Sequence, residues 1–303
     1  MTIQYLGHDY VVAQIDKLVS AILSPKTRIS IKHISEQLNI YYEAMALLSD
    51  DELDYCNTIN WFMGSCYLVC GNHYPSEFIW DRANTERFVT ALRSYQYEFT
   101  TDVVDFADKE RRNSRSLDPY MSYFLNELAR VLIVRVDIKI KAEFAHLVTI
   151  KNFHDFKVDF NDKVGRKRGC FKHLRGHVWA IEQGVETGGL HCHLLLIYNG
   201  DKCQKDWFLG DAVGKCWVEI TEGLGCYYNC NTKQHKAPYK RKGTLGIGRI
   251  HKDNPVEVDN AMHAGGYLVR PEKYEQRLKA WLPDMRSFGH GNLPKKKNRG
   301  VKR

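Results

Sequence analysis

The chain has 303 residues, of which 44% are hydrophobic and 26% charged, the composition of a globular protein with a sizeable core in one large or two ordinary domains. No stretch approaches the roughly 18 consecutive apolar residues of a membrane span, so we expect no membrane partner. The N-terminus lacks a secretory signal, and nine cysteines are an odd number in a chain too long to need disulfides. These features predict a reducing, cytoplasmic location.

The net charge of +8 is distributed unevenly along the chain. Residues 1–129 contain 11 basic and 18 acidic residues, whereas the remaining 174 contain 33 basic and 18 acidic residues. An acidic front part joined to a basic back part indicates that the back part meets a polyanion, and nucleic acid is the first candidate. The alternative is a basic surface that is merely solvated.

The front part has the hydrophobic spacing of helices. We predict helices over residues 10–23, 31–48 and 84–109, and a further helix that begins at Pro119 after a capping aspartate. Residues 32–45 have some features of half a helix-turn-helix. They lack a glycine turn and a clear second helix, which favours an ordinary packing helix.

The pattern changes to strands after residue 130. Residues 131–140 alternate with period two, and residues 177–183 and 190–198 are further strands. The six residues between the last two are rich in turn formers, which predicts an antiparallel hairpin. We then expect a helix over 203–220, loops or an irregular hairpin over 221–260, and a helix over 261–282 that is interrupted near Pro271.

Two histidines on the second arm of this hairpin are candidate metal ligands. His191 and His193 are two positions apart on a strand, so they project from one face, while Cys192 projects into the opposite layer. A turn centred in the six-residue link places Glu182 nearly opposite His191 on that face. Two imidazoles and one carboxylate suit a divalent ion that also holds substrate oxygens, which points to Mg²⁺ or Mn²⁺. Zinc is the alternative, because imidazoles suit it well.

Two cysteine pairs compete as metal sites. Cys226 and Cys230 are followed by His235, and Cys66 and Cys70 have the same spacing. Neither pair has a matching Cys-x2-Cys partner, so we expect reduced thiols rather than structural zinc.

The candidate nucleophile is Tyr267, which follows two glycines and precedes Arg270 by three positions. On a helix these two side chains are neighbours, and the cation stabilises a phenolate or a phosphate in its transition state. Tyr274, seven residues after Tyr267, is the alternate nucleophile, although Pro271 between them argues against a shared face. The plainer interpretation of Tyr267 is a core residue.

In combination these motifs resemble the HUH endonucleases, which comprise rolling-circle replication initiators, relaxases and related transposases. More narrowly, the chain resembles the inovirus (filamentous phage) replication initiators and the prophage proteins of the YagK/YfjJ type. The blocks that carry the resemblance are VLIVRVDIKI (131–140), RGHVWAIEQG (175–184), GLHCHLLL (189–196), YLVRPEKY (267–274) and RSFGHG (286–291).

The resemblance implies an α+β fold, with an antiparallel sheet that has helices on its outer side and the active site on its open face. It divides the chain into a mainly helical region of unknown role (1–117), an HUH endonuclease domain (118–294) and a basic tail (295–303). His191 and His193 match the family's metal ligands, and Tyr267 matches its nucleophile. Arg270 stands where lysine is common.

The activity implied is metal-dependent nicking and rejoining of single-stranded DNA at a replication origin, through a 5′-phosphotyrosine intermediate. Expected partners are the host helicase and polymerase in a bacterial cytoplasm. A relaxase or single-strand transposase with the same chemistry is one alternative, and a non-catalytic, zinc-containing DNA-binding regulator is another. The basic residues expected to contact DNA are Arg135, Lys139, Arg166, Lys167, Arg168, Lys240, Arg241, Lys242, Lys295, Lys296 and Lys297.

Overall fold

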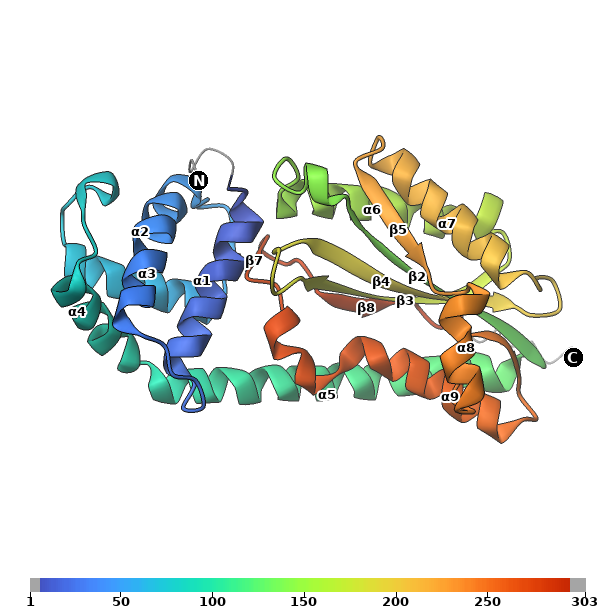
Figure 1. The fold of residues 1–303 in the computed structure, drawn as a ribbon. Coiled ribbons are helices and arrows are strands. Elements are labelled where there is room, and N and C mark those ends of the chain that lie inside the picture. Colours follow the sequence, from blue (N-terminus) through green and yellow to red (C-terminus); the bar gives the residue numbers. More distant parts are fainter. Residues whose placement is uncertain (1–5, 295–303) are drawn as a thin grey trace, which may run out of the picture.

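The computed structural model describes residues 6–294 (Figure 1). It begins with a helical region, in which a short strand, β1 (Asp54–Tyr55), also lies. The helices of this region are α1 (His8–Leu23), α2 (Ile31–Leu48), α3 (Asn57–Cys70) and α4 (Arg82–Arg93). Their buried side chains form one hydrophobic cluster, to which α2 contributes Ile34, Leu38 and Met45. The packing-helix interpretation of residues 32–45 is therefore confirmed.

The long helix α5 (Gln96–Glu127) joins this region to the sheet (Figure 1). Two predictions are wrong here: the helix expected over 84–109 is broken at Ser94–Tyr95, and Pro119 lies inside α5 instead of starting a helix. A proline in a helix loses one backbone hydrogen bond. The neighbouring residues Tyr120 and Phe124 are buried against the sheet, and this packing offsets that loss. The expected division between residues 117 and 118 falls within this helix.

The rest of the chain forms an antiparallel sheet of β2 (Arg130–Ile140), β3 (Leu174–Gln183), β4 (Leu190–Asn199), β5 (Gly225–Asn229), β6 (Gly248–His251) and β8 (Phe288–His290). The strand order is β5-β2-β4-β3-β8, with β6 paired to β2 beyond the end of β5. The predicted hairpin is β3–β4, and Glu182 lies directly opposite His191 in its register. The α+β fold and the register on which the metal prediction depends are both confirmed.

The two faces of the sheet have different covers (Figure 1). Helices α6 (Ile150–Arg166) and α7 (Asp206–Ile220) pack on the face that carries Val136, Leu194 and the fully buried Cys192. The opposite face packs its Ile133 and Leu195 against α5 and α9 (Pro255–Gly266). The alternation of β4 thus sends Cys192 away from the two histidines, as expected.

Residues 221–260, expected to be loops or an irregular hairpin, contain β5, α8 (Lys233–Arg241), β6 and the start of α9. The short strands β5 and β6 are held by their pairing with β2, and α8 has no buried residue. These elements therefore lack the hydrophobic periodicity by which a strand or helix is predicted from sequence. The helix expected over 261–282 is also corrected. The chain leaves α9 at Gly266 and continues as 3-10 turns, Tyr267–Val269 and Pro271–Gln276, before β7 (Ala280–Trp281) pairs with β1.

Between residues 6 and 294, no helix combines the length and the apolar character that a membrane crossing requires.

Candidate metal centre

Glu182, His191 and His193 form the cluster that the strand pattern predicted. One ligand atom from each lies within 4.8 Å of the others. The Glu182 Oε2 atom is 3.2 Å from His193 Nε2 and 3.5 Å from His191 Nε2. Glu182 and His193 are buried, while His191 is partly exposed. Because the ligands come from paired strands, the sheet holds their backbones at fixed separations.

Both imidazoles are held by a second partner. His193 Nδ1 donates to Asp137 Oδ1 at 2.7 Å, and His191 Nδ1 donates to the carbonyl oxygen of Gly189 at 3.3 Å. These contacts turn the Nε2 atom of each ring toward Glu182. A ligand histidine whose other nitrogen is held by a carboxylate or carbonyl is the usual arrangement in protein metal sites. The three side chains therefore fit a metal ion.

Asp137 was not singled out in the sequence. It pairs directly with His193 between β2 and β4. The available signal was its place on the charged face of the strand over 131–140, between Arg135 and Lys139. That signal identifies the face but not the neighbouring strand, so it does not point to His193.

The ionisation of the cluster favours a cation. Burial raises the pKa of Glu182, but hydrogen bonds from His191, His193 and Lys273 outweigh it and hold that pKa below its usual range. Burial likewise raises the pKa of Asp137, but His193 and Arg135 bring it down to about 2. For His193, burial lowers the pKa and the two carboxylates raise it by more. Two ionised carboxylates thus flank one imidazole, and a bound metal ion would displace a proton from His193.

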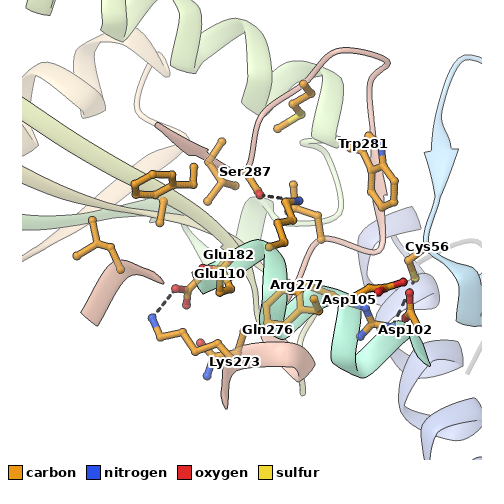
Figure 2. A pocket seen from close by; sticks show the side chains of 18 of the residues that line it. Cys56, Asp102, Asp105, Glu110, Glu182, Lys273, Gln276, Arg277, Trp281 and Ser287 are labelled. Atoms are coloured by element: carbon orange, nitrogen blue, oxygen red, sulfur yellow. Dashed lines mark hydrogen bonds and ion pairs between the residues drawn. The ribbon is translucent and has the colours of Figure 1, made fainter. Parts of the chain in front are cut away.

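Lys273 brings a positive charge to Glu182 of the cluster. Its Nζ atom donates to Glu182 Oε1 at 2.5 Å (Figure 2). Arg270 lies over the ring of Tyr267, where the sequence pattern places it. Pro271 begins a second 3-10 turn, and Lys273, two residues later, has a non-helical backbone and reaches Glu182.

Tyr267 lies beside the cluster. Its ring centroid is 6.0 Å from that of His193. Three cationic groups surround the ring: Arg135 Cζ at 4.6 Å, Arg270 Cζ at 4.8 Å and Lys273 Nζ at 4.0 Å from its centroid. The negative charge of a phosphate beside this ring is therefore favoured electrostatically.

Tyr274, the alternate nucleophile, has a different setting. It is buried, its hydroxyl donates to Asp102 Oδ2 at 2.6 Å, and Arg277 lies 3.8 Å from its ring centroid. Burial raises the pKa of Tyr274, and the carboxylate of Asp102 raises it further. This tyrosine packs the C-terminal segment against Phe99 and Phe106 of α5.

Three cavities lie at the cluster or beside it. The Glu182 cavity, of about 510 Å³, includes Lys273 and extends to Asp102 (Figure 2). The Tyr267 cavity, of about 410 Å³, includes Arg135 and Arg270. The His191 cavity, of about 800 Å³, includes His193 and Asp137. The cluster is therefore accessible from two of these cavities, those of Glu182 and His191.

Helix α1 braces the site from the N-terminal region. Gln183 donates to the Asp9 carbonyl at 3.1 Å, next to Glu182. Gly188, in the hairpin turn, has a φ of +67°, and a Cβ there would lie 2.2 Å from the Asp9 carbonyl oxygen, so only glycine fits. Asp16 pairs with Arg277 at 2.7 Å, four residues beyond Lys273. The N-terminal helical region thus contacts both the β3–β4 hairpin, which carries Glu182, and the segment that carries Lys273.

The two cysteine pairs are not part of the Glu182–His191–His193 cluster. Cys66 and Cys70 are buried among the N-terminal helices, and Cys230 is buried with its Sγ atom 3.6 Å from Asp137 Oδ2. Within residues 6–294, no group of three or more potential metal ligands includes either pair.

The basic residues fall into separate groups. Arg135 is mostly buried beside Tyr267, and Lys139 is exposed at the His191 cavity. Residues 240–242 are exposed at the end of α8, near the Tyr267 cavity. Residues 166–168 are exposed at the end of α6, in the layer on the other face of the sheet. Lys295, Lys296 and Lys297 lie outside the described residues.

The fold and the site define an α+β protein whose antiparallel sheet carries a candidate metal centre beside a tyrosine. Residues 103–291 match the YagK/YfjJ C-terminal domain, which is more than half of the chain, so the protein belongs to the YagK/YfjJ family. The match starts inside α5 and includes the metal cluster, Tyr267 and Lys273, but leaves out α1 to α4. No curated protein and no solved structure matches the chain.

Proposed function

We propose that this protein is an HUH-type endonuclease that nicks and rejoins single-stranded DNA. The observation that carries the proposal is the position of Tyr267, beside the Glu182–His191–His193 cluster and among three cationic side chains. A nucleophile, a metal centre and positive charge within one site are the requirements of phosphoryl transfer by a tyrosine.

In the proposed reaction the Tyr267 oxygen attacks the scissile phosphorus. A bond forms between the phenol oxygen and phosphorus, the bond to the 3′-oxygen breaks, the phenol proton passes to solvent, and the 3′-oxygen takes up a proton. Held by Glu182, His191 and His193, Mg²⁺ or Mn²⁺ would supply a Lewis acid for the scissile phosphate. The phosphodiester energy is retained in the 5′-phosphotyrosine, so attack by a 3′-hydroxyl reseals the strand without ATP.

The surrounding side chains prepare this step. Arg135, Arg270 and Lys273 place positive charge around the Tyr267 ring, where it would stabilise the negative charge of the phosphate in the transition state. Asp137 keeps His193 oriented with Nε2 toward the cluster.

Rejoining of a nicked strand is what a rolling-circle replication initiator requires. In this role the protein acts at a replication origin, and a host helicase and polymerase extend the released 3′-end. A relaxase or single-strand transposase uses the same chemistry. A zinc-containing regulator is less favoured, because structural zinc is held by four protein ligands and the cluster within residues 6–294 offers three beside open cavities.

A covalent-capture experiment tests the proposal. The protein is incubated with Mn²⁺ and a random-sequence, labelled single-stranded DNA library, and denaturant-resistant adducts are isolated, sequenced and mapped by mass spectrometry. We expect adducts on Tyr267, none from Tyr267→Phe, and normal yield from the matched control Tyr274→Phe. Cleavage by Tyr267→Phe at the wild-type rate would contradict the proposal and indicate a metal-activated water instead.

A further inference from the structure

A row of three aromatic rings lies beside the candidate metal centre. The Tyr228 and His235 ring centroids are 5.5 Å apart, and those of His235 and Tyr239 are also 5.5 Å apart. Tyr228 lies on β5, and the other two lie one turn apart on α8. We call these three residues the aromatic row.

The register of the sheet places one end of this row near the metal ligands. Asp137 pairs with His193 on one side and with Tyr228 on the other. Directly paired residues project from the same face, so Tyr228 stands on the face of the cluster, two strands from His193. Tyr228 lines the His191 cavity, whereas His235 and Tyr239 line the Tyr267 cavity. The aromatic row therefore lines two cavities, one that contains His191 and His193 and one that contains Tyr267.

Core packing does not account for these rings. Tyr228 is 50% exposed and Tyr239 is 45% exposed, and α8 contains no buried residue. Single exposed aromatics are common in proteins, but a contiguous row beside a cavity needs another explanation.

The charge around the row indicates what covers it. The α8 sequence, KQHKAPYKR, contains four basic residues and no acidic one, and Lys242 follows directly. Basic side chains that alternate with exposed aromatic rings bind single-stranded nucleic acid, because the cations hold phosphates while unpaired bases stack on the rings. In a duplex the base faces are stacked on each other and cannot reach such rings.

We infer that the aromatic row binds unpaired nucleobases of single-stranded DNA that flank the scissile phosphate. The inference rests on the proposed function, since it names how that substrate is held. Stacking accepts any base, so the row fixes the strand's path between the cavities and leaves sequence recognition to other contacts.

Equilibrium binding tests this inference without catalysis. Full-length Tyr267→Phe protein, without divalent metal, is titrated into fluorescent single-stranded oligonucleotides and matched duplexes, and anisotropy is recorded. Adding Tyr228→Ala or Tyr239→Ala should weaken single-strand binding about fivefold to a hundredfold. Tyr228→Phe and Tyr239→Phe should bind normally. Tyr74→Ala is the matched control, because Tyr74 is 72% exposed in the N-terminal region, and it should also bind normally.

The salt dependence separates stacking from charge. The alanine variants of the row should keep the slope of log K against log salt, whereas Lys240→Ala with Lys242→Ala should make it shallower. Single-strand binding by Tyr228→Ala and Tyr239→Ala equal to that of Tyr74→Ala would overturn the inference, as would an equal loss for duplex DNA. Because this assay involves neither metal nor adduct, a failure of the proposed chemistry would be seen only in the capture experiment.

Discussion

Replacement of Asp137 is the sharpest test of the metal centre, because this residue touches the cluster only through His193. The His193 Nδ1 atom lies 2.7 Å from Asp137 Oδ1. Loss of such an outer partner weakens metal affinity by about 10- to 100-fold, or ~1.4 to ~2.7 kcal/mol. Asp137→Asn keeps an oxygen that can accept a hydrogen bond from His193 Nδ1 but removes the charge, so we expect metal affinity to fall by about tenfold. Asp137→Ala removes both and should approach a hundredfold.

Isothermal titration with Mn²⁺ measures this effect. Asp162→Asn is the matched control, because Asp162 is exposed on α6, over the opposite face of the sheet. Denaturant unfolding without metal shows whether each variant is folded before titration. Mn²⁺ affinity of Asp137→Ala within twofold of the wild type would refute the view that Asp137 orients a metal ligand.

Three further predictions concern pH, packing and the tail. Burial lowers the pKa of His193, but its two carboxylates raise it above the usual 6.5, so protons compete with metal at a higher pH than they do for an ordinary histidine. The rise in Tm that Mn²⁺ causes should therefore be smaller at pH 6 than at pH 8. An equal rise at the two pH values would contradict this prediction. Asp16→Ala leaves the buried Arg277 and Lys279 without their carboxylate partner. It should lower the free energy of unfolding, measured by urea titration, by roughly 3–5 kcal/mol. A loss below about 1 kcal/mol would show that the pairing contributes little. Removal of residues 295–303 deletes six basic residues. The slope of log K against log salt for single-strand binding should become shallower by up to ~0.7 per lost phosphate contact. An unchanged slope would show that the tail does not contact DNA.

The sequence by itself determined those features of the site that depend on local geometry. A strand has a side-chain period of two, so His191 and His193 had to share a face and Cys192 had to oppose them. A six-residue link between two strands limits how they can pair, and this placed Glu182 opposite His191, as the structure has it. The uneven distribution of charge along the chain is likewise given directly by the order of its residues.

Only the tertiary structure decided the contacts between distant segments. Which strand lies beside β4 is set by packing of the whole sheet, so the pairing of Asp137 with His193 was not visible in either strand. The contact of Lys273 with Glu182 depends on the turn that begins at Pro271 and on the pairing of Arg277 with Asp16 of α1. Pro119 stays within α5 because the sheet packs against its neighbours. In each case burial and ion pairing between distant segments outweigh a local conformational preference of a few kcal/mol or less. A short stretch of sequence does not reveal these long-range contacts.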